Sequence, residues 1–199
     1  MIKKCNSLLL MVAIVFGTMF TANAQDNTPS DSMLESIMLT PDNTKLKVLG
    51  ENMRKHNQKY HKEGAYKSTV YAISTGPNVG KIVWMMGPLK YTHLDSRPAE
   101  GGHDDDWRDN IMPYIKKMNA AEYWKQDIER SNTSMLDGDA SKYPVLRVRY
   151  FEVTPGHGYT VNRLFSQVKA TLESIEGEYP WGVYDNEFLQ GDLGRHIAA

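Results

Sequence analysis

The sequence predicts an α+β protein, made of one βαββαβ unit followed by a second, incomplete copy of the same order. Three observations predict this class. Short segments rich in β-branched and aromatic residues are separated by Gly, Pro and Asn, as strands are. Between them lie stretches whose apolar residues recur at steps of three and four, which indicates amphipathic helices. Finally, a set of sequence landmarks recurs at a nearly constant spacing along the chain.

The first 24 residues have the pattern of an export signal. Lys3 and Lys4 precede the apolar run Leu8–Phe20, and Ala22-Asn23-Ala24 fits the small-residue cleavage pattern. We therefore expect the mature chain to begin at Gln25 and to be secreted or periplasmic. The alternative is that the segment stays uncleaved as a membrane anchor.

Composition limits the chemistry of the mature chain. Cys5 is the single cysteine, and it precedes the apolar run, so it cannot be the lipidated residue of a processed protein. Removal of residues 1–24 leaves no thiol for a disulfide, a nucleophile or a metal site. The net charge is −1, and losing Lys3 and Lys4 makes it −3 (−1 − 2). We therefore expect neither a nucleic-acid partner nor a membrane span after cleavage.

The first unit is expected over residues 33–133, after a flexible lead-in at 25–32. A strand at 35–41 precedes an amphipathic helix that stops near Gly64. Strands at 66–75 and 81–88 should pair as a hairpin across a Gly-Pro-Asn turn. The apolar stripe of the helix consists of Leu46, Leu49, Met53, His56 and Tyr60.

A second helix is expected to begin at His103, with acidic residues in its first turn, where the helix dipole favours them. Its expected stripe is Trp107, Ile111, Tyr114, Ile115 and Met118. Residues 121–130 fit either a fourth strand or the end of this helix, and we favour the strand. The resulting βαββαβ order is that of a ferredoxin-like unit.

After a polar linker at 134–143, the pattern starts again over residues 144–199. A strand at 145–155, a helix ending at Gly177 and a strand at 181–189 follow one another, and a turn at 191–194 leads into another strand. The landmarks recur 113 or 114 positions later: Thr40-Pro41 as Thr154-Pro155, Gly64-x-Tyr66 as Gly177-x-Tyr179, Val70-Tyr71 as Val183-Tyr184, and Gly80-Lys81 as Gly194-Arg195.

We interpret these matches as a tandem duplication. The alternative is that two such segments share Gly and Pro punctuation without a common origin. The second copy stops inside its third strand, so either the natural protein ends with half a repeat or this is a truncated gene product. Because half a unit leaves a helix face and a sheet edge uncovered, we expect a homodimer or a poorly ordered second half.

The duplicated units, with Val153-Thr154-Pro155-Gly156 before an amphipathic helix, resemble the dimeric α/β-barrel superfamily, which includes antibiotic-biosynthesis-monooxygenase-like domains. More narrowly, the chain resembles secreted Bacteroidota proteins with tandem units, and Gly101–Pro113 is its most distinctive segment. The resemblance implies sheets packed face to face as an α/β-barrel-like sandwich, with any ligand between them. Some members degrade haem or oxidise quinone precursors without a metal. The haem-degrading branch uses an Asn–Trp–His set, of which only Trp84 has a suitable place in this chain.

Histidines are the first candidates for chemistry. His56 lies on the apolar stripe beside Tyr60, where it could ligate haem or act as a base, although a partly buried structural histidine is favoured. His61 follows five residues later, about 140° round the helix. The two are therefore not expected to share a metal ion. His103 and the three acids after it have suitable ligand types, but a solvated helix start is favoured. We therefore expect no metal site and no cofactor.

The remaining candidates lie on strands. Tyr71 and Trp84 would line a ligand pocket together with His56. Arg147 and Arg149 alternate with apolar residues and share one strand face, which predicts either an anion anchor or, preferably, a solvent-exposed sheet face. No catalytic residue is assigned.

Two functions are open from the sequence. The favoured one is an exported, non-catalytic binding or assembly protein that holds a small apolar or aromatic ligand, or a partner, between its sheets. The alternative is a cofactor-independent, monooxygenase-like oxidoreductase acting on an aromatic or haem-like substrate. Because no acid–base or nucleophile set is evident and a fold does not confer activity, whether the protein is an enzyme stays open.

Overall fold

The computed structural model describes residues 32–99, 101–133, 144–177, 179–188 and 196–198. The expected signal peptide, nearly all of the lead-in, the linker at 134–143 and the turn at 191–194 lie outside these residues. Within the described part of the chain, no helix is long and apolar enough to cross a membrane.

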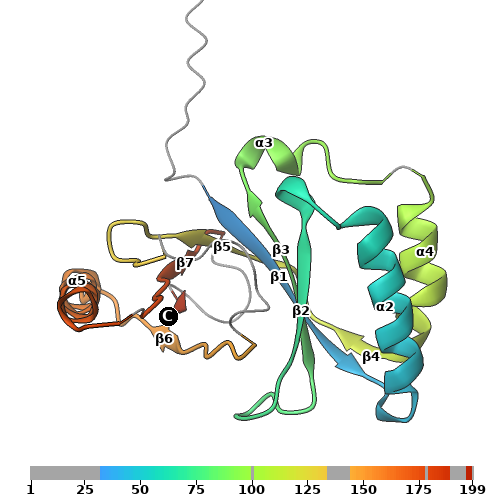
Figure 1. Ribbon diagram of the computed structural model, residues 1–199, viewed down its shortest axis with the longest axis horizontal. Coiled ribbons are helices and arrows are strands. Elements are labelled where there is room, and N and C mark those ends of the chain that lie inside the picture. Colours follow the sequence, from blue (N-terminus) through green and yellow to red (C-terminus); the bar gives the residue numbers. More distant parts are fainter. Residues whose placement is uncertain (1–31, 100, 134–143, 178, 189–195, 199) are drawn as a thin grey trace, which may run out of the picture.

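The fold is α+β, as the sequence predicts, and its strands form a mostly antiparallel open sheet (Figure 1). The sheet order is β2-β3-β1-β5-β7-β8-β6, and β4 also pairs with β1. The strands are β1 (Met33–Pro41), β2 (Ser68–Ala72), β3 (Ile82–Leu89), β4 (Ile115–Met118), β5 (Glu122–Gln126), β6 (Tyr150–Glu152), β7 (Tyr184–Asn186) and β8 (His196–Ala198). The α-helices are α2 (Leu46–Tyr60), α3 (Tyr91–Leu94), α4 (His103–Asn110) and α5 (Gly158–Ser174).

The main core lies between β1, β3 and the helix α2. Strand residues on one face of β1 and β3 alternate inward, as a strand with one buried face requires. The buried residues of this core are Met33, Leu39, Leu49, Met53, Trp84, Met86, Leu89 and Ile111. In Figure 1, α2 and α4 run beside each other on this side of the sheet, and their contact places the N-terminus of α4 near the C-terminus of α2.

The second half of the chain has a smaller core and continues the same sheet. Val153, Phe165 and Val183 form this core, in which the ring of Phe165 meets that of Phe151 edge-on. Strand β7 pairs with β5, so the two halves are joined by backbone hydrogen bonds between strands.

The prediction of a helix from His103 to Met118 is wrong beyond Asn110, where α4 ends. Residues 112–114 form a short 3-10 helix, and Ile115–Met118 is the strand β4, paired with β1. Pro113 explains the break, since proline lacks the N–H with which an α-helix would continue at this position. Residues 122–126 form the favoured fourth strand, β5.

The strand expected at 145–155 is reduced to Tyr150–Glu152. Arg147 and Arg149 therefore precede the strand, and both are exposed in irregular backbone. The two arginines therefore do not share a strand face. The anion anchor and the exposed sheet face were both predicted from that shared face.

Candidate metal site

Three histidines from two separate segments meet where α2 ends and α4 begins. His56 belongs to the last turns of α2, His61 follows its last residue, and His103 is the first residue of α4. One ring nitrogen from each lies within 4.8 Å of the other two. His56 and His61 are 1% and 4% exposed, so the cluster is almost closed to water.

His61 reaches this cluster because it is no longer helical. The helix α2 ends at Tyr60, and His61 has φ −132° and ψ 34°, while its N–H still donates to the carbonyl oxygen of Asn57. The ring centroids of His56 and His61 are 5.3 Å apart. The prediction that these two histidines could not reach one metal ion is therefore wrong: it assumed that the helix continued through residue 61. The expectation of no metal site rested partly on the separation of these two histidines, and that separation is absent.

Every histidine of the cluster uses its Nδ1 atom for a hydrogen bond to an oxygen acceptor. His56 Nδ1 lies 2.7 Å from Asp106 Oδ2, and His103 Nδ1 lies 2.7 Å from Asp104 Oδ1. His61 Nδ1 lies 2.9 Å from the carbonyl oxygen of Tyr66. Because carbonyls and carboxylates only accept, each Nδ1 carries the proton, and each neutral ring then has a lone pair on Nε2.

The three Nε2 atoms are the ring nitrogens left for a further ligand. Those of His61 and His103 lie 3.0 Å apart, within hydrogen-bond distance when one of them carries a proton. The Nε2 atom of His56 is buried and has no hydrogen-bond partner among the described residues. A metal ion between these nitrogens would satisfy all three, and an Nδ1 atom bonded to an oxygen acceptor is the usual arrangement of histidines that ligate a metal.

Burial sets the charge of these rings. It lowers the pKa of His61 to about 4, and it also lowers the pKa of His56, although the hydrogen bond to Asp106 opposes the effect. The hydrogen bond from His56 in turn lowers the pKa of Asp106. At neutral pH both buried rings are therefore neutral, which is the form that binds metals.

Aromatic rings enclose the cluster. Tyr60 lies 5.0 Å from the ring of His56, Trp107 lies 5.2 Å from it edge-on, and Trp84 lies 5.0 Å from His61 edge-on. The indole N–H of Trp84 donates to Asn57 Oδ1 at 3.1 Å. This enclosure lowers the local dielectric and strengthens any interaction between the nitrogens and a cation.

Of the candidates predicted from the sequence, the structure brings His56, Tyr60 and Trp84 together. Tyr71 lies on the other face of the sheet: it pairs with Val83, the neighbour of Trp84, and successive strand residues point to opposite faces. Arg147 and Arg149 lie outside the cluster. Sequence reasoning missed His61 and His103 as partners of His56, together with Asp106 as its hydrogen-bond partner. The sequence contained one sign of this cluster: one histidine directly follows a predicted helix, and another begins the next predicted helix.

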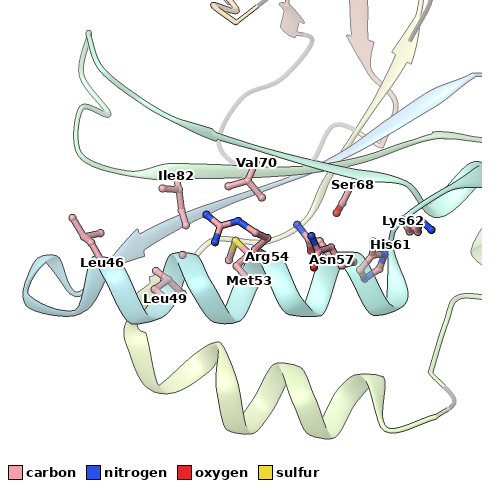
Figure 2. Close-up of a pocket in the computed structure, with 12 residues that line it drawn as sticks. Leu46, Leu49, Met53, Arg54, Asn57, His61, Lys62, Ser68, Val70 and Ile82 are labelled. Carbon is pink, nitrogen blue, oxygen red and sulfur yellow. The ribbon is translucent and has the colours of Figure 1, made fainter. Parts of the chain in front are cut away.

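A groove borders the cluster on the other side of α2, between this helix and the hairpin of β2 and β3 (Figure 2). It is lined by Leu46, Leu49, Gly50, Met53, Arg54, Asn57, Gln58, His61, Lys62, Ser68, Val70 and Ile82. The expected pocket of His56, Tyr71 and Trp84 does not coincide with it, since none of these three residues lines the groove.

No protein-family model matches this sequence. No curated protein matches it either.

Proposed function

We propose that this protein binds a divalent transition-metal ion, zinc foremost, through the Nε2 atoms of His56, His61 and His103. The observation that carries the proposal is the convergence of one ring nitrogen from each histidine to within 4.8 Å of the others, with the Nε2 atoms of His61 and His103 held 3.0 Å apart. The buried, unpartnered Nε2 of His56 completes the set.

The dimensions suit a tetrahedral site after a small adjustment. Zinc–nitrogen bonds of about 2.0–2.1 Å place two tetrahedral ligand atoms about 3.4 Å apart. The ligand nitrogens here are at most 4.8 Å apart, so side-chain rotations that move them by roughly 1 Å close the site around an ion. The group has three members within the described residues, which leaves a fourth position for water or a small exchangeable ligand.

The outer contacts support the same conclusion. Histidines that bind metals usually donate their second ring N–H to a carboxylate or a backbone carbonyl, and here all three do so, to Asp106, Asp104 and Tyr66.

Isothermal titration of chelator-treated protein with Zn²⁺ tests the proposal. We expect one ion per chain and, for Co²⁺, the visible absorption of a tetrahedral nitrogen site. His56→Ala and His103→Ala should each abolish both signals. The matched control is His157→Gln, because His157 is exposed and remote from the cluster. Equal zinc binding by the His103→Ala and His157→Gln variants would overturn the proposal.

This function keeps the protein in the class of binding proteins that the sequence favoured, with a metal ion as the ligand. The oxidoreductase alternative receives no comparable support, because Tyr71 lies on the sheet face opposite Trp84. Export through residues 1–24 remains part of the proposal, and N-terminal sequencing of the mature protein tests it. The expected homodimer remains a prediction that light scattering tests.

We further propose that the chain is a tandem pair of ferredoxin-like units in a sandwich-like arrangement. Two observations support the duplication. The order β2-β3-β1-β5 is that of a ferredoxin-like sheet. The antiparallel pairing of β1 with β3 in the first half also recurs as the antiparallel pairing of β6 with β8 in the second.

A further inference from the structure

The groove between α2 and the β2–β3 hairpin has the size of a small-ligand site. Its volume is about 530 Å³, within the range of pockets that hold small molecules. Figure 2 shows Arg54 extending from α2 toward the hairpin, with Val70 and Ile82 directed at the helix from the opposite side. The groove and the proposed metal site share His61, whereas His56 and His103 do not line the groove.

One end of the groove is apolar and open. Leu49 and Met53 are buried beneath it, whereas Leu46 and Val70 remain 48% and 37% exposed. The apolar area of these two side chains would leave water if a hydrocarbon chain lay between them. From Leu46 to Arg54 the helix rises by about 12 Å, at 1.5 Å per residue, which sets the length of chain that fits.

The groove also has two cations. Arg54 lies beside Val70 and Lys62 lies at the far end (Figure 2), and the lining residues include no Asp or Glu. Neither cation forms an ion pair with a carboxylate elsewhere in the described part of the chain. Ser68 lies between them along the groove (Figure 2), and its buried hydroxyl has no hydrogen-bond partner among the described residues. An anionic group beside Arg54 would be attracted by both cations.

We infer that this groove binds an anionic amphiphile of the medium-chain carboxylate class. Arg54 holds the carboxylate, Lys62 adds positive potential further along the groove, and the hydrocarbon chain lies between Leu46, Met53 and Val70. Charge complementarity selects this occupant over a neutral or cationic amphiphile of equal length.

Calorimetric titration with decanoate below its micelle concentration tests the inference. We expect saturable binding with one molecule per chain, and much weaker binding of decyl maltoside and decyltrimethylammonium. Arg54→Gln should weaken decanoate binding about tenfold, since a charge-assisted hydrogen bond is lost, while Arg54→Lys should retain most of it. Lys55→Gln is the matched control, because Lys55 is exposed on the same helix and does not line the groove.

A second pair of variants tests the position of the chain. Val70→Asp should abolish decanoate binding, whereas Val79→Asp, on an exposed turn outside the groove, should not change it. Circular dichroism and thermal midpoints check that each variant folds. The inference is overturned if decanoate does not bind saturably, if the three amphiphiles bind equally, or if folded Arg54→Gln and Val70→Asp both bind like the wild type. The His103→Ala variant should bind decanoate normally, which separates this outcome from the fate of the metal site.

Discussion

The Nε2 atoms of His61 and His103 lie 3.0 Å apart although 42 positions separate the two residues in the chain. Both rings have their Nδ1 atoms bonded to oxygen acceptors, so in their neutral forms two imidazole lone pairs face each other. A cation between the two nitrogens, either a proton on one ring or a shared metal ion, relieves this repulsion. Since burial lowers the pKa of His61 to about 4, His61 itself is a poor site for that proton at neutral pH.

Asp106 should determine the affinity of the site without being a ligand. Its carboxylate accepts from His56 Nδ1 at 2.7 Å and so fixes the ring with Nε2 inward. We expect Asp106→Asn to lower zinc affinity by about 10–100-fold, measured by competition with a chromogenic chelator, with one ion still bound. Asp105→Asn is the control, because Asp105 is exposed and pairs with Arg108 on the same helix. An unchanged affinity in Asp106→Asn would assign this carboxylate a purely structural role.

Tryptophan fluorescence should report occupancy directly. Of the four tryptophans in the chain, Trp84 and Trp107 contact the histidine cluster, and Trp181 belongs to the second core. Binding of Cu²⁺, which quenches nearby indoles, should therefore lower the emission of the wild type. The quenching should be largely lost in Trp84→Phe/Trp107→Phe and retained in Trp181→Phe. Equal quenching in both variants would place the copper elsewhere.

The metal-free protein should lose stability on mild acidification. Burial lowers the pKa of His61 to about 4 in the folded state, against about 6.5 in an unfolded chain, and it lowers the pKa of His56 in the same direction. Between pH 6.5 and pH 4 the unfolded chain therefore binds protons that the folded chain does not, so the free energy of unfolding falls as the pH falls.

Urea unfolding in the presence of a chelator at several pH values measures this slope. His61→Gln should show a shallower dependence than the wild type, because one proton-binding difference is removed, whatever its effect on absolute stability. Parallel slopes in the two proteins would contradict the prediction.

The buried carboxylate of Glu35 depends on Arg97. Its side chain is fully buried, and its Oε1 accepts from Arg97 Nη2 at 2.9 Å. Because breaking such a pair leaves an uncompensated buried charge, Arg97→Met should lower the free energy of unfolding by about 2 kcal/mol, less than a fully buried pair would since Arg97 is partly exposed. Adding Glu35→Gln should recover most of the loss, and chemical denaturation of the four proteins of this cycle measures it. Additive losses would mean that the two residues act independently.

Much of the first half of the fold was predictable from local pattern. The stripe Leu49, Met53 and His56 on α2, the hairpin of β2 and β3, and the alternation along β1 each follow from a periodicity in a few consecutive residues. The same reasoning failed at Pro113, where a single residue overrode the apolar stripe of a helix. It also failed at 145–149, where residues of alternating polarity stayed outside any strand.

The sequence by itself determined which residues could take part in chemistry at this site, and that His56 would face the interior. Only the tertiary structure decided that they meet. The non-helical backbone of His61 turned its ring toward that of His56, and the packing of α4 against α2 brought His103 and Asp106 to both. The physical reason is that a periodicity fixes which side of one element a residue occupies. The distance between residues on different elements depends instead on where a helix ends and on how the chain between the two elements closes.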